Sequence, residues 1–171
     1  MSLYDLSVPQ LKRMLTNLDR WLRAGIALAE AKRFDPAVLL GARLAPDQFP
    51  LLKQVQSACD HAKFAAARLT AKDPPKHPDT EQTVDEILAR IQTVLTYLNS
   101  FEVADFHGAE DRMVVIGALP PGKGMRGTEY LSEFALPNFY FHVTTAYAIL
   151  RHNGVQLGKL DYMGSITLRD V

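Results

Sequence analysis

The chain has 171 residues, of which 47% are hydrophobic, and this is enough apolar material for one core, so we expect a single domain over residues 1–171. Its 19 basic and 19 acidic side chains balance, which argues against a nucleic acid or an anionic membrane as partner. The one cysteine, Cys59, excludes an internal disulfide. No apolar stretch has the length of a membrane span or the pattern of a signal peptide. We therefore expect a cytoplasmic protein.

Apolar residues at helical spacing predict a first amphipathic helix through Leu11 to Ala29. Ser7 is a candidate capping residue, and Pro9 suits a first turn, where a missing N–H group costs little. A second apolar stripe runs from Leu51 to Leu69 and predicts a second helix. The polar segment 71–82, with three prolines, is a loop.

A third helix is predicted to begin at Thr83, because Thr83 and Glu86 have the spacing of a capping box. The Gly- and Pro-rich segment that follows contains "MVVIGA" and "TEYLSEFA", which we interpret as two short extended segments of a hairpin. A fourth helix is predicted from Pro137 or Asn138 to Gly154, and its apolar residues on nearly all sides make it the helix that we expect to be most buried. The tail from residue 159 is expected to be irregular. Together these elements favour an all-α protein, an antiparallel four-helix bundle with a short hairpin before its last helix.

Three histidines are candidate site residues. His61 shares a helix face with Ala58 and Ala65, so it should point inward, either into a ligand site or as a core histidine bonded to a neighbouring helix. His142 and His152 are ten residues apart, a rise of ~15 Å along a helix, so they cannot bind one metal ion together. At most one of them can bind a metal ion together with His61. The alternative interpretations are that His142 is a buried polar residue and that His152 helps to close the helix C-terminus.

Three segments, "DHAKFAAARL", "GMRGTEYL" and "LPNFYFHVTTAYAILRHNGVQLGKLDYMG", resemble a bacterial family of unknown function in the DinB/YfiT-like superfamily. The resemblance implies a four-helix bundle, a homodimer, and relatives that include metal-dependent thiol transferases with three histidine ligands. His61 stands at the position of the second-helix ligand, and "HNG" places His152 at the second position of an H-x-x-x-H pair. Ala148 stands at the first position of that pair, so one of the three implied ligands is missing.

Two functions are compatible with these features. The first is a small-ligand-binding or non-catalytic protein with an incomplete metal triad and a pocket near His61, His142, Tyr147 and His152. The alternative is a divalent-metal-dependent thiol transferase or hydrolase, in which His61 and one histidine of the last helix, His152 or His142, bind Zn or Ni and thereby lower the pKa of a thiol or water. No cofactor is certain from the sequence.

Overall fold

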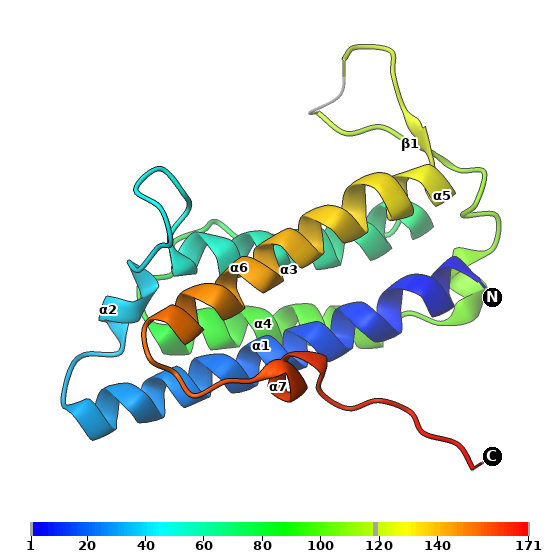
Figure 1. Ribbon diagram of the computed structural model, residues 1–171. Helices are drawn as coiled ribbons and strands as arrows, with labels where there is room; N and C mark the ends of the chain where they lie inside the picture. Colours follow the sequence, from blue (N-terminus) through cyan, green and yellow to red (C-terminus); the bar gives the residue numbers. More distant parts are fainter. Residues whose placement is uncertain (1, 118–119, 171) are drawn as a thin grey trace.

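The computed structural model describes residues 2–117 and 120–170. The chain is predominantly helical, with one small two-stranded sheet (Figure 1). Its long helices lie side by side (Figure 1); they are α1 (Leu3–Lys32), α3 (Leu51–Thr70), α4 (Val84–Asn99) and α6 (Leu136–His152). A short helix, α2 (Ala37–Leu40), lies in the connection between α1 and α3.

Helix α1 begins earlier than the sequence suggested, because a different serine caps it. The Ser2 hydroxyl accepts the Asp5 N–H (3.3 Å), and the Asp5 carboxylate accepts the Ser2 N–H (2.9 Å), which forms a capping box. The prediction that Ser7 caps the helix is wrong: Ser7 is buried within α1 and donates to the Leu3 carbonyl. The predicted box of α4 is confirmed, since Thr83 and Glu86 make both reciprocal bonds.

The segment between α4 and α6 contains the sheet. After a 3-10 turn, η1 (Val103–Phe106), strand β1 (Met113–Val114) pairs antiparallel with β2 (Met125–Arg126). The interpretation of "TEYLSEFA" as an extended segment is wrong, because this stretch is helical: α5 (Gly127–Glu129) is followed by a π-helix, η2 (Tyr130–Ala135), which continues into α6. We attribute the wide turn to Pro137, which donates no hydrogen bond and whose ring needs room beside the preceding turn.

Gly127 fixes where this helical segment begins. A Cβ atom at this position would lie 1.8 Å from the Ala109 carbonyl oxygen, so only glycine allows the two backbone segments to approach this closely. The contact places η2 beside α3, and the aromatic side chains of η2 therefore reach the face of α3 that carries His61.

Helix α3 is the centre of the packing. It contacts α1, α4 and α6, and twelve of its twenty residues are buried, compared with seven of seventeen in α6. The expectation that the last helix would be the most buried is therefore wrong. The small side chains of α3, among them Ala58, Ala62, Ala65 and Ala66, let the neighbouring helices approach it from several sides.

The tail also departs from the prediction, because it contains a short helix, α7 (Lys159–Met163), which packs on α1. The Tyr162 ring stacks on Trp21, and the Asn17 amide donates to the Tyr162 carbonyl. Among the helices of the described residues, none combines the length and the apolar character needed to cross a membrane.

Candidate functional site

Four side chains of α3 lie along one face of that helix and line an open cleft. They are Ser57, His61, Phe64 and Arg68, whose spacing of four, three and four residues keeps them on one helical face. Asp60 of α3, Ile116 and Gly117 after β1, and Phe134 of η2 complete the lining. We call this cleft, of about 270 Å³, the His61 cleft.

A second histidine lies directly behind His61. The imidazole rings of His61 and His142 are stacked with centroids 5.3 Å apart and an interplanar angle of 16°. His142 is only 8% exposed, and its Nδ1 lies 2.8 Å from Gln54 Oε1. The Gln54 amide nitrogen donates to the Phe49 carbonyl (3.1 Å), which turns the amide oxygen toward His142. His142 Nδ1 must then carry the proton, and Nε2 keeps its lone pair.

Both rings are held in the neutral form at neutral pH. The pKa of His142 is lowered to about 4, mainly by burial and to a smaller extent by the neighbouring His61 and Lys53. Burial is also the main cause that lowers the pKa of His61; Asp60 opposes this shift and Arg68 supports it. A neutral imidazole at the cleft wall can donate one hydrogen bond and accept another.

Arg68 is the other strongly polar group of the cleft. Its guanidinium lies over the Phe64 ring (4.8 Å to the centroid) and near the Tyr130 ring (5.7 Å), and it donates to the Tyr130 hydroxyl (3.2 Å). That hydroxyl in turn donates to the Phe64 carbonyl (3.2 Å). Within residues 2–117 and 120–170, no carboxylate forms a salt bridge with Arg68.

On the opposite side of Asp60, charged groups are paired with one another. The Arg90 side chain is 1% exposed, and its two terminal nitrogens contact Asp60 (2.7 Å), Asp79 (2.5 Å) and Glu81 (3.0 Å). Lys63, whose side chain is 4% exposed, also contacts Asp60 (2.7 Å).

Lys53 adds a contact to Asp79 (2.7 Å), so three cations face three carboxylates; we call this set, Lys53, Lys63, Arg90, Asp60, Asp79 and Glu81, the Arg90 network. It fastens the Pro-rich loop to α3 and α4, and Lys63 also contacts His77 of that loop (2.9 Å). The buried Cys59 lies next to the network, and burial raises the pKa of its thiol to about 12. Cys59 therefore stays protonated at neutral pH and is unsuited to be a nucleophile.

The structure brings two of the four predicted pocket residues together. His61 and His142 are in contact, whereas the Tyr147 ring packs against Trp21 and Tyr162 on the side of α6 that faces α1 and α7. His152 is exposed at the end of α6, and Gly154, two residues later, lies near the last turns of α1.

His61 and His152, which were predicted to bind one metal ion together, thus lie in two different regions of the molecule. Within the described parts of the chain, no three His, Cys, Asp or Glu side chains gather in a way that could hold a metal ion. A three-ligand metal centre made of protein side chains therefore does not fit these residues.

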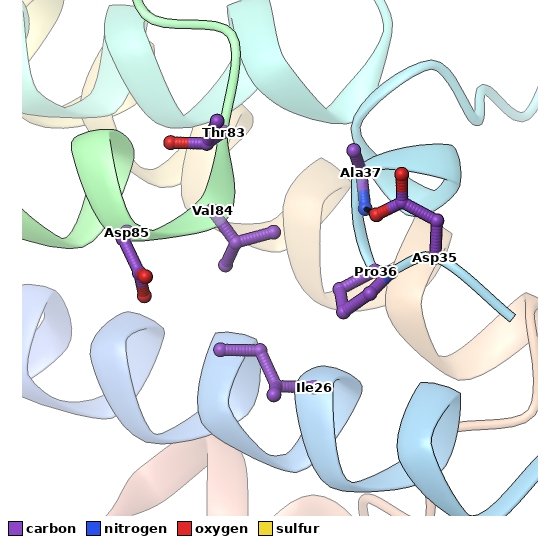
Figure 2. A pocket seen from close by; sticks show the side chains of 7 residues that line it. All are labelled: Ile26, Asp35, Pro36, Ala37, Thr83, Val84 and Asp85. Atoms are coloured by element: carbon purple, nitrogen blue, oxygen red, sulfur yellow. Dashed lines mark hydrogen bonds between the residues drawn. The ribbon is translucent and has the colours of Figure 1, made fainter. Parts of the chain in front are cut away.

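A second hollow lies between α1, α2 and the start of α4, with a volume of about 260 Å³ (Figure 2). Ile26 and Val84 face each other across it, and the Asp35 carboxylate turns back to accept the Ala37 N–H (2.9 Å). The Thr83 hydroxyl is occupied as the cap of α4. Because Asp35 and Thr83 already bond to backbone N–H groups at helix ends, this hollow has fewer polar groups available to a ligand than the His61 cleft has.

Comparison with known proteins gives a consistent result over the whole chain. The sequence model of a family described as a domain of unknown function, DUF1993, matches residues 3–163. The crystal structure of a DinB family member protein from Shewanella denitrificans is 48% identical in sequence and superposes with a TM-score of 0.94; the match covers 99% of this chain and 96% of that chain. No curated protein matches the sequence.

Proposed function

Since the chain belongs to the DUF1993 family and is similar throughout to a DinB family member, we propose that it is a small-molecule-binding protein whose ligand occupies the His61 cleft. The observation that carries this proposal is a cleft with an aromatic wall and a neutral imidazole that a second, buried imidazole supports. Ligand sites in helical proteins are commonly built in this way, from side chains on facing helices.

The support behind His61 distinguishes the cleft from a chance surface hollow. Gln54 and the Phe49 carbonyl set the orientation of His142, and the His142 ring stacks on His61. Holding two uncharged imidazoles in place in this way costs conformational entropy and partly buries polar atoms. Such an arrangement is more useful in a binding site than in a core, where an apolar side chain would pack without that cost.

Chemical-shift mapping tests the proposal. The backbone amides of the labelled protein would be followed while small aromatic fragments are added at millimolar concentration. We expect saturable shifts at residues 57–68, 116–117 and 134, which His61→Ala removes and His152→Ala leaves unchanged. Shifts centred on the hollow near Ile26, or no saturable shifts at all, would refute a ligand site at the cleft.

A divalent-metal-dependent thiol transferase or hydrolase is the second candidate. It is favoured by the lone pair that His142 Nε2 keeps next to the neutral His61. It is disfavoured because two imidazoles without a third protein ligand hold zinc less firmly than three or four ligands do. Stoichiometric Zn or Ni in protein purified without a tag, lost on His142→Ala, would support this candidate; no uptake at micromolar metal would remove it.

Four further predictions remain proposals of ours. We propose that the long helices form an antiparallel four-helix bundle of the DinB/YfiT-like type, which their mutual packing supports. We propose that residues 1–171 are one domain, and that the protein is cytoplasmic and a homodimer. A solution mass of one chain across micromolar concentrations would contradict the dimer.

A further inference from the structure

We propose that the ligand of the His61 cleft is an anion, a small molecule whose carboxylate or phosphate group binds Arg68 and whose apolar ring packs between Phe64 and Phe134. This inference rests on the proposed function and adds to it the chemical class of the ligand. The arrangement of charges around the cleft leads to it.

Among the described residues that line the cleft, Asp60 is the one carboxylate, and the protein already neutralises it. Asp60 contacts both Arg90 and Lys63 at 2.7 Å, and both of these cations are nearly inaccessible to solvent. The Arg90 network as a whole balances three cations with three carboxylates. It therefore leaves no surplus negative charge that would attract a cationic ligand.

Arg68, in contrast, is a cation for which the described residues provide no acidic partner. It lines the cleft together with His61, which carries no charge at neutral pH. The cleft thus presents one net positive charge to a bound molecule. A guanidinium with free N–H groups matches a carboxylate or a phosphate, because its planar donors can form two parallel hydrogen bonds to either group.

The protein also orients this guanidinium in advance. The Phe64 and Tyr130 rings lie on it, and its bond to the Tyr130 hydroxyl is supported in turn by the bond from that hydroxyl to the Phe64 carbonyl. An arginine that needed only to be solvated would require none of these contacts. Fixing the side chain before binding lowers the entropy that a ligand must offset.

The rest of the lining indicates the body of the ligand. Phe64, Phe134 and Ile116 provide apolar contact, and the Phe134 ring lies 6.1 Å from the His61 ring. Ser57 and His61 provide hydrogen-bonding groups on the same face of α3. A flat ring with an acidic substituent matches this distribution, whereas a polyanion does not, because Arg68 is the one unpaired cation among the described residues of the lining.

Binding of benzoate, phenyl phosphate, benzamide and benzylamine, measured by ligand-observed NMR with the full chain, tests this inference. We expect both anions to bind, and benzamide and benzylamine to bind at least about tenfold more weakly, since one charge-assisted hydrogen bond has about this effect. The relative affinities of benzoate and phenyl phosphate identify which anion the site prefers. Arg68→Gln should remove the preference for anions, while Arg20→Gln, which changes an exposed arginine of α1, should leave it intact.

The outcomes separate this inference from the proposed function. If benzamide binds in the cleft as tightly as benzoate, or if Arg68→Gln retains the preference for anions, the anionic class is wrong while the ligand site stands. If none of the four compounds binds, and the fragment mapping also finds no saturable shifts, the ligand site itself is wrong. A circular dichroism spectrum of Arg68→Gln like that of the unchanged protein ensures that a loss of binding reflects the missing charge.

Discussion

Two faces of α3 carry charged side chains, and they differ in whether these charges are paired with opposite charges of the same chain. On the face toward α4, Asp60 and Lys63 join Arg90 in a network in which every charge has a partner from the same chain. On the face toward η2, Arg68 and His61 contact aromatic rings, and neither forms a salt bridge with a carboxylate of the described residues. The difference indicates that the first face serves folding, whereas the second has polar groups available for a ligand.

The largest expected effect is a difference in stability between a variant of Arg90 and a variant of Arg68. Arg90→Met leaves three carboxylates without their shared cation, so we expect the free energy of unfolding in urea to fall by about 3–5 kcal/mol. Arg68→Met removes a half-buried cation that has no salt bridge, so its loss should stay below about 1 kcal/mol. Equal losses for the two variants would show that both arginines serve stability and would remove the contrast.

The second largest expected effect is a loss of stability in acid, which we expect the buried His142 to cause. Because burial lowers the pKa of His142 from 6.5 to about 4, the unfolded chain takes up a proton at a higher pH than the folded protein does. Stability is therefore full above pH 6.5 and is lost as the pH falls toward 4, by at most about 3 kcal/mol from this residue.

Urea denaturation at several pH values measures this dependence. His142→Asn should flatten the slope between pH 6.5 and 4, while His107→Asn, at a loop histidine, should retain it. Asp79 adds a loss of stability only at lower pH, below its ordinary pKa of 3.8: burial alone would raise its pKa, but hydrogen bonds from Lys53 and Arg90 lower it. An unchanged slope in His142→Asn would mean that the buried ring takes up its proton as readily as the unfolded chain does.

A smaller effect is expected from the hydroxyl that holds Arg68. Tyr130→Phe removes the bonds to Arg68 and to the Phe64 carbonyl, which should cost about 1 kcal/mol of stability and weaken benzoate binding severalfold. Tyr147→Phe is the matched control, because that ring lies in the aromatic cluster with Trp21 and Tyr162. Stronger weakening of benzoate binding by the Tyr147 variant would place the ligand on the other side of α6.

The smallest effect is expected at the histidine that the family resemblance favoured. His152→Ala changes an exposed side chain at the end of α6, so the free energy of unfolding should stay within about 0.5 kcal/mol. Zinc or nickel uptake measured on the same variant adds a second readout. Loss of stoichiometric metal on this change would restore His152 as a ligand.

Helical periodicity located the long helices well, because each buries an apolar stripe that recurs every three to four residues. It failed where local signals were ambiguous. Ser2 and Ser7 are both plausible caps by residue type, and only Ser2 has an acidic residue that completes the box. The segment before Pro137 resembled a strand because it mixes aromatic and polar residues, yet contact with α3 keeps it helical.

The site could be predicted in part. The spacing with Ala58 and Ala65 predicted that His61 points inward, but its side chain is only partly buried and lies with Ser57, Phe64 and Arg68 on the face of α3 that lines the cleft. The spacing of these four residues would have identified the helical side of the cleft. The partner of His61 could not be found in this way, because the choice of His142 depends on how α6 is placed along α3. Phe134 and Ile116 reach the cleft from segments without any periodic pattern, so their positions depend on tertiary packing alone.

The most direct test of the ligand site is a titration of the protein with benzoate while the ring carbons of its five histidines are observed by NMR. If the cleft binds the anion, the His61 signal shifts saturably, the stacked His142 follows with a smaller shift, and His107 and His152 stay in place. Equal, non-saturating shifts of all five signals would mean that benzoate acts only as a salt, and the His61 cleft would no longer be a ligand site.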